Sequence, residues 1–186
     1  MELERIFHPI GHGAFYTERI TTKDRTINIV YDCGTKNSQK ILHSCIDNTF
    51  NDDSEIDVLF ISHFHVDHIS GIGYLRDRCN KKIKTIVLPY MDKISKNIFL
   101  LELSKKNISV DLKDELNSLI SSPSDYFGSE TKLVEVRPEL SDEKSQEPID
   151  INSLDQNISV TTGQIIKHFS WIFILANYKY NRFKIT

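Results

Sequence analysis

Cysteine is scarce in this sequence of 186 residues, and apolar runs long enough to cross a membrane are missing. The three cysteines, Cys33, Cys45 and Cys79, are odd in number and irregular in spacing, which argues against a disulfide framework. The most apolar late segment, residues 169–176, is far shorter than the about 20 residues that a membrane helix needs. The charged segment 1–5 has no apolar stretch behind it and does not resemble a signal peptide. We therefore expect a cytoplasmic protein in a reducing compartment, without membrane association.

A surplus of basic charge is also missing. Lys and Arg number 23 and Asp and Glu number 26, so the net charge is -3, and both signs are mixed along the chain. The overall charge therefore does not indicate nucleic-acid binding, although it is compatible with a local basic patch. The apolar fraction of 39% and the charged fraction of 26% are ordinary for a globular protein. Length and composition predict one domain over residues 1–186.

The hydrophobic pattern predicts alternating strands and helices. Gly11 and Gly13 break the first apolar stretch and suit a tight turn. Residues 58–61 form a continuous apolar run, which is typical of a strand covered on both faces. The expected strands are 6–10, 14–20, 26–31, 58–62, 84–88, 132–136, 157–162 and 169–176. The expected helices are 38–50, 71–78, 93–106 and 111–120.

This order of elements indicates an α/β layer architecture. The first five strands should share one sheet, and the helices that follow Gly34 and Gly71 should cover one of its faces. Residues 138–150 are polar and acidic, with Pro138 and Pro148 at the edges, and predict a solvated loop.

Three histidines and one aspartate, His63, His65, Asp67 and His68, follow the apolar run within six positions. We call residues 63–68 the histidine loop. The loop after a strand end is exposed but rigidly anchored, which is where reactive groups are commonly held. In an extended segment His63 and His65 point to the same side, and Asp67 and His68 can face the same point from the turn that follows. Imidazole and carboxylate ligands suit zinc, and a catalytic zinc keeps one position open for water.

The alternative to a metal site is that these are ordinary surface residues, which any single histidine usually is. Their density behind a buried strand favours the metal interpretation. Two interpretations of Asp32 stay open: an acceptor that orients a histidine of the loop, or a residue that closes a turn. For His12 an ordinary loop residue is favoured, and for Cys33 a small buried side chain.

Residues 57–73 read Asp-Val-Leu-Phe-Ile-Ser-His-Phe-His-Val-Asp-His-Ile-Ser-Gly-Ile-Gly and resemble the HxHxDH motif of the metallo-β-lactamase superfamily. Two earlier pieces are similar to the same family. Residues 11–14, Gly-His-Gly-Ala, resemble its Gly-x-Gly turn between the first strands. Residues 31–34, Tyr-Asp-Cys-Gly, resemble its apolar-Asp-x-Gly strand end. Order and spacing agree over residues 6–88.

The resemblance implies an αββα sandwich with metals at one edge of its two sheets. It places His63 and His65 in a first metal site and Asp67 and His68 in a second, and it makes Asp67 the candidate catalytic residue. One or two Zn²⁺ ions are expected, with Mn²⁺ or iron as alternatives. A metal-bound hydroxide would be the nucleophile, because zinc lowers the pKa of bound water from 15.7 to about 7.

The family pattern is incomplete downstream. The binuclear site usually has another histidine, a bridging aspartate and a final histidine, whereas this chain has one histidine after His68, namely His168. His168 is either a further metal ligand or, as we favour, a polar residue that flanks a strand. Asp150 and Asp155 are the nearest late carboxylates, and neither stands in a recognisable motif. Because 186 residues are few for both halves of the fold, we expect the second half to be incomplete.

Two hypotheses from different functional classes follow. The first is a zinc-dependent hydrolase that acts on a phosphodiester or another ester-like bond, in a small molecule or a nucleic acid. The second is a truncated, non-catalytic member that serves as an interaction or regulatory module for a protein partner. The intact histidine loop favours the first, and the missing downstream ligands favour the second. A mononuclear metal protein without turnover is a simpler third option.

Overall fold

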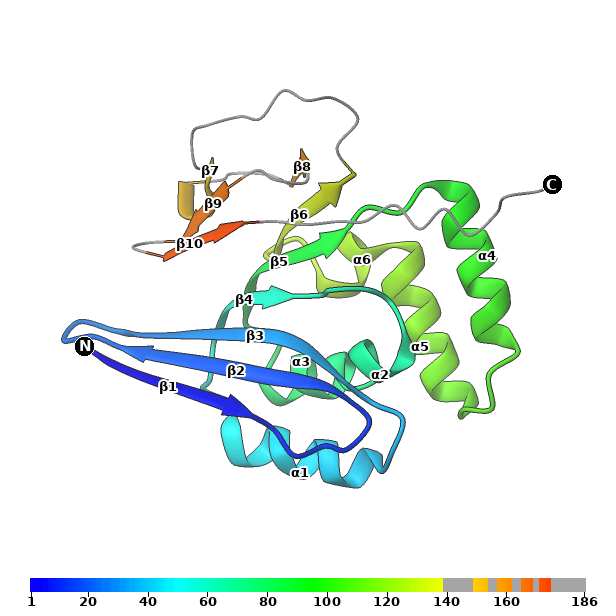
Figure 1. The fold of residues 1–186 in the computed structure, drawn as a ribbon, viewed down its shortest axis with the longest axis horizontal. Helices are drawn as coiled ribbons and strands as arrows, with labels where there is room; N and C mark the ends of the chain where they lie inside the picture. The colour runs from blue at the N-terminus through cyan, green and yellow to red at the C-terminus, as the bar shows by residue number, and fades with distance from the viewer. Residues whose placement is uncertain (139–148, 154–156, 162–164, 169–170, 175–186) are drawn as a thin grey trace.

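A computed structural model gives the fold of the chain (Figure 1). The structure describes residues 1–138, 149–153, 157–161, 165–168 and 171–174. Strands and helices alternate through much of this length, as the hydrophobic pattern predicts.

Seven strands form the main sheet, in the order β1-β2-β3-β4-β5-β6-β8. They are β1 (Glu2–Phe7), β2 (Gly13–Thr21), β3 (Thr26–Thr35), β4 (Ile56–Phe60), β5 (Ile83–Pro89), β6 (Lys132–Arg137) and β8 (Ile158–Thr161). The first three strands pair antiparallel because short turns join them, whereas the pairs from β3 to β8 are parallel across longer connections. The prediction that the first five strands share one sheet is confirmed.

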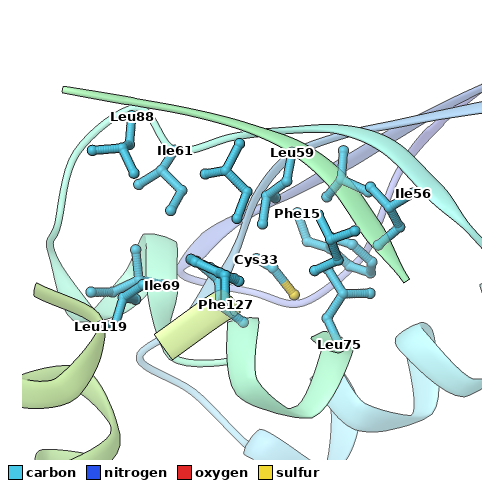
Figure 2. Packing of buried hydrophobic residues seen from close by; sticks show 14 of the residues in the cluster. Phe15, Cys33, Ile56, Leu59, Ile61, Ile69, Leu75, Leu88, Leu119 and Phe127 are labelled. Atoms are coloured by element: carbon cyan, nitrogen blue, oxygen red, sulfur yellow. The ribbon is translucent and has the colours of Figure 1, made fainter. Parts of the chain in front are cut away.

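Helices cover one face of this sheet (Figure 1). They are α1 (Gln39–Thr49), α2 (Val66–Ile69), α3 (Ile72–Arg78), α4 (Lys93–Ser104), α5 (Val110–Ser121) and α6 (Pro123–Phe127). Phe15 and Leu59 of the sheet meet Leu75 and Leu119 of the helices in the larger apolar core (Figure 2). This core packs under β4 and so holds the strand that leads into the histidine loop.

The opposite face of the sheet carries a second apolar cluster. Ile29, Val58 and Val134 are fully buried in it, one each from β3, β4 and β6. Ile149 also packs against this cluster. A second sheet of three strands, in the order β10-β9-β7, comprises β7 (Ile149–Asp150), β9 (Ile165–His168) and β10 (Trp171–Ile174). The mixed α/β architecture agrees with the predicted αββα sandwich, and much of its expected second half falls outside the described residues.

The third strand is longer than its pattern predicts. Instead of ending in a turn at Asp32, β3 continues to Thr35. Asp32 adopts a positive φ of 53°, and the register with β2 shifts between Phe15 and Tyr16, which marks a β-bulge. The irregularity lets the strand keep its pairing with β2 while Asp32 bonds to Ser62, just ahead of the histidine loop.

The first strand is displaced from its prediction. It covers Glu2–Phe7 rather than residues 6–10, and Glu2 stands opposite Thr21 of β2. β1 lies at the edge of the sheet and is mostly exposed, so charged side chains are tolerated there and the apolar pattern carries little signal.

Apolar spacing identifies the buried faces of two helices only in part or not at all. In α1 the spacing places Ile41, Cys45 and Ile46 on one face; Ile46 is buried as predicted, but the structure buries Leu42 beside it and leaves Ile41 49% exposed. In α4 the residues that the spacing selects are Ile94, Ile98 and Leu101, and they are 72%, 40% and 59% exposed. The fully regular stripe of α4 therefore faces solvent rather than the core.

The predicted solvated loop over residues 138–150 is wrong at its end. Ile149 and Asp150 form β7, which pairs in parallel with Ile166 and Lys167 of β9. The rest of this prediction, residues 139–148, lies outside the described residues.

Candidate metal centre

The histidine loop is anchored by hydrogen bonds on both sides. The Ile61 amide donates to the Val87 carbonyl at 2.8 Å, so β5 holds the exit from β4. His65 is extended, with φ -69° and ψ 147°, and α2 begins at the next residue. The His68 amide donates to the His65 carbonyl at 2.9 Å and closes the first turn of that helix. Asp67 and His68 therefore lie on α2, directly after the extended part of the loop.

Two glycines let α2 approach the ends of β2 and β3. A Cβ atom on Gly34 would stand 2.5 Å from the Ile69 nitrogen, and one on Gly13 would stand 2.8 Å from the Asp67 carbonyl oxygen. The Gly71 amide donates to the Cys33 carbonyl at 2.8 Å across the same contact. Any larger residue at Gly13 or Gly34 would push the histidine loop away from the sheet.

The three imidazole rings of the loop lie together. The ring centroid of His63 is 3.8 Å from that of His68 and 4.7 Å from that of His65, which it meets edge-on. His65 also lies near Phe99 of α4, with ring centroids 6.1 Å apart. The structure thus gathers the predicted histidines, and their role as metal ligands stays a prediction.

Asp32 orients one of these rings. Its carboxylate accepts the Ser62 amide at 2.8 Å, the Ser62 hydroxyl at 2.6 Å and the His68 Nδ1 at 2.8 Å. Because Nδ1 of His68 donates its hydrogen to this carboxylate, the lone pair of its Nε2 is left for another partner. Of the two open interpretations of Asp32, the structure supports the acceptor that orients a loop histidine.

Ser62 orients a second ring. Its hydroxyl has one hydrogen, which it donates to Asp32, so it can only accept from Nδ1 of His63 at 2.9 Å. The lone pair of His63 Nε2 is then also left for another partner. Burial, and then the neighbouring His68 and His65, lower the pKa of His63, which favours the neutral form that a metal requires.

Asp67 is buried and its two carboxylate oxygens differ. Oδ2 lies 3.1 Å from Nζ of Lys36 and 3.5 Å from Nε2 of His12. Oδ1 is buried and has no hydrogen-bond partner among the described residues. Burial acts to raise the pKa of Asp67, but the Lys36 hydrogen bond, the Asp67 backbone amide and the charges of Lys36 and His68 outweigh it, so the pKa is lowered. The group is therefore a carboxylate at neutral pH.

The fit of these residues to a metal ion can be judged from their geometry. Imidazole nitrogens and a carboxylate are donors that zinc prefers, and Oδ1 of Asp67 is a buried oxygen without a described partner. Within the described ranges, however, no three His, Cys, Asp or Glu side chains stand close enough to hold a metal as they are. The donor chemistry fits a metal, and these side chains would have to come closer together to bind it.

The remaining candidates lie elsewhere or play other parts. His168 ends β9 of the second sheet, and its side chain lies outside the described residues. Asp150 accepts the amide of Asn152 at 2.9 Å, and this bond shapes the short turn after β7. Cys33 is fully buried, and burial raises the pKa of its thiol, so the prediction of a small buried side chain is confirmed.

Sequence patterns missed two neighbours of Asp67 and one positioning residue. His12 was expected to be an ordinary loop residue, but it lies beside Asp67. Lys36 gave no signal except that it follows the Asp-x-Gly strand end by two residues. Ser62 stands in the recognised motif, yet its bond to His63 depends on the position of Asp32 across the sheet.

Every helix in the described part of the chain is too short or too polar to cross a membrane.

Two comparisons with known proteins bear on this site. Residues 20–96 match the sequence model of the metallo-beta-lactamase superfamily. A protein named probable RNase MJ4, from Methanocaldococcus jannaschii, is 34% identical over 95 residues, which make up 51% of this chain and 18% of that protein. The chain thus spans less than a fifth of this relative. The superfamily match contains Asp32, Lys36 and the whole histidine loop, and it confirms the resemblance predicted from the motif.

Proposed function

We propose that this chain is a metal-dependent hydrolase, because residues 20–96 match the metallo-β-lactamase superfamily. His63, His65, Asp67 and His68 would hold the metal, with His168 as a further candidate. Zinc is the expected ion, bound once or twice, and Mn²⁺ or iron are the alternatives. When bound, the metal would supply a water of lowered pKa and a positive charge beside the scissile bond.

The observation that carries this proposal is the chain of hydrogen bonds from Asp32. It holds Nδ1 of His68 directly and Nδ1 of His63 through Ser62, which leaves the Nε2 lone pair of each ring for another partner. Outer partners of this kind fix the tautomer and the orientation of metal-binding histidines. A surface cluster of histidines without a metal function would have no need of a buried carboxylate that orients its rings.

For Asp67 we propose a role at the reacting centre. Its carboxylate is ionised and buried, and it stands on the first turn of α2 between the histidines and Lys36. Oδ1, which has no partner in the described part of the chain, would bind the metal or accept a proton from the attacking water.

For the substrate we propose a phosphodiester, and RNA as the polymer that contains it. The name of the Methanocaldococcus relative supports RNA, although the match covers only 18% of that protein. A net charge of -3 means that an RNA substrate would have to be bound by local contacts rather than by overall attraction. We also propose a cytoplasmic location, where RNA is available and free thiols stay reduced.

The test is turnover of a phosphodiester reporter, bis(p-nitrophenyl) phosphate, by the purified chain with added Zn²⁺ or Mn²⁺. We expect slow, chelator-sensitive turnover that falls at least about 10- to 100-fold in His65→Ala. The matched control is His43→Ala, because His43 stacks on Tyr74 away from the loop, with ring centroids 3.7 Å apart. Turnover that is unchanged in His65→Ala would exclude the histidine loop as its source.

A second candidate function is a non-catalytic interaction module. The observation that favours it is the exposed apolar stripe of α4, formed by Ile94, Ile98 and Leu101. Exposed apolar side chains grouped on one helix are typical of protein contact surfaces. A chain that binds zinc but shows no turnover with either metal would favour this second function.

A further inference from the structure

Lys36 places a positive charge inside the candidate metal centre. It follows the last residue of β3, and its Nζ lies 3.1 Å from Oδ2 of Asp67. The two side chains differ in exposure, 50% for Lys36 and 10% for Asp67. The carboxylate is therefore fixed in the fold, while the ammonium reaches it from the solvent side on a flexible stem.

The surroundings of Asp67 leave this ammonium as its closest charged partner among the ion pairs of the described residues. Nε2 of His12 and Nε2 of His68 are farther from Oδ2, at 3.5 Å and 4.0 Å. The other oxygen, Oδ1, is buried without a described partner. Of the two carboxylate oxygens, Oδ2 is thus paired with Lys36, and Oδ1 has no partner among the described residues.

We propose that Lys36 competes with a metal ion for the charge of Asp67, so that its ammonium on Oδ2 weakens the binding of a metal to the same carboxylate. This inference rests on the proposed function and concerns the metal occupancy of the same site. A metal ligated by a carboxylate stands about 2.0–2.2 Å from its oxygen. An ammonium within hydrogen-bond distance of the same group would then face a divalent cation at close range, and the two like charges repel.

Two consequences follow for the order of binding. A first metal ion would be bound by the histidines, since Nδ1 of His63 and Nδ1 of His68 are already held by Ser62 and Asp32. A metal at Asp67 would bind most tightly with the Lys36 side chain turned out into solvent, which its half-exposed position allows. Lys36 therefore weakens binding at Asp67 and disfavours a second metal ion.

The test is zinc binding to the purified full chain at pH 7, measured by competition with a chromophoric chelator and by bound zinc per chain. Lys36→Met removes the charge and keeps an unbranched side chain of similar length. We expect it to bind Zn²⁺ roughly 3- to 30-fold more tightly than the wild type, the order expected for relief of a water-screened repulsion. Lys36→Gln should behave in the same way, which keeps the test valid if the methionine variant folds poorly.

Two controls separate competition from a general charge effect. Lys36→Arg keeps the positive charge and should bind zinc within about twofold of the wild type. Lys23→Met removes one charge from the exposed turn between β2 and β3, at the opposite end of β3 from Lys36, and should leave zinc affinity unchanged.

The outcomes distinguish this inference from the proposed function. Equal or weaker zinc binding in both Lys36→Met and Lys36→Gln, beside a wild type that binds zinc, would overturn the competition and leave the metal site standing. Equal tightening in Lys23→Met would overturn it as well, because overall charge would then be the cause. No zinc bound by any variant would overturn the proposed function itself, and the inference with it.

Discussion

Replacing Asp32 by asparagine tests the hydrogen-bond chain that organises the centre. Oδ2 of Asp32 accepts both the Ser62 hydroxyl at 2.6 Å and Nδ1 of His68 at 2.8 Å. The substituted side chain would carry an amide nitrogen in place of one carboxylate oxygen and could no longer accept a hydrogen bond at that position. Asparagine has the same shape and tolerates the positive φ of 53° found here, so backbone strain is not added.

The magnitude follows from the number of bonds lost. Hydrogen bonds to a charged group contribute about 1.5–3 kcal/mol each, and the Ser62 hydroxyl can rotate to another acceptor, so we expect Asp32→Asn to lower the free energy of unfolding by about 2–4 kcal/mol. Because His68 also loses the group that orients its ring, zinc affinity should fall about 10- to 100-fold. Both effects arise from the same two bonds and should appear together.

Urea denaturation and zinc competition at pH 7 measure the two effects on the same samples. The matched control is Asp24→Asn in the exposed turn between β2 and β3, which should change the free energy of unfolding by less than about 0.5 kcal/mol. A loss of stability with unchanged zinc affinity would refute the argument that Asp32 orients a metal ligand. No loss of either would refute the hydrogen-bond chain itself.

Two further predictions concern the close packing at Gly34 and the burial of His8. Gly34→Ala would place a Cβ 2.5 Å from the Ile69 nitrogen, so it should lower the free energy of unfolding by about 1–3 kcal/mol and weaken zinc binding. The control Gly128→Ala should affect stability alone. Unchanged zinc binding in Gly34→Ala would contradict the close approach of α2. Burial lowers the pKa of His8 from 6.5 to about 4, so the unfolded chain binds more protons between these values and stability should fall as the pH drops through this window. His8→Phe should flatten this part of the stability curve, measured by urea denaturation, and an unaltered slope would show that His8 is not its source.

The architecture could be predicted because its strongest signals are local. The apolar run before the histidine loop predicts a doubly covered strand, and β4 is buried on both faces by two apolar clusters. Helices α1 and α3 were expected over residues 38–50 and 71–78, and the structure places their ends within one residue of these bounds. The bounds of strand β1 were predicted wrongly because an exposed edge strand needs no alternation of apolar residues.

The candidate metal centre could be predicted only in part, because the residues that contact Asp67 come from distant segments of the chain. The spacing of His63, His65, Asp67 and His68 is visible in six residues, and the structure gathers the three imidazole rings. The contacts of Lys36 and His12 with Asp67 depend on how the ends of β2 and β3 meet α2. Two glycines and a β-bulge allow these strand ends to approach α2. Neither feature produces a periodic pattern in the sequence from which the contact could be predicted.

The apolar stripe on α4 shows that a clear periodic pattern can also mislead. Ile94, Ile98 and Leu101 have the spacing of a core-facing helix, yet they are exposed large apolar residues of α4. Periodicity establishes that a helix has an apolar side but not what covers it. Leu103, which falls outside the stripe, is the residue that the helix buries.

The order of strands in the main sheet has a consequence for how the chain reaches this structure. From β1 to β6 every strand lies beside the strand that precedes it in the chain, and β8 continues the same order. A chain emerging from the ribosome therefore presents each new strand to an edge that is already built, and no strand must insert between two others. The sheet can grow in the order of synthesis. Asp32 and Lys36 are made before the histidine loop, so β3 can already be in place when residues 63–68 emerge.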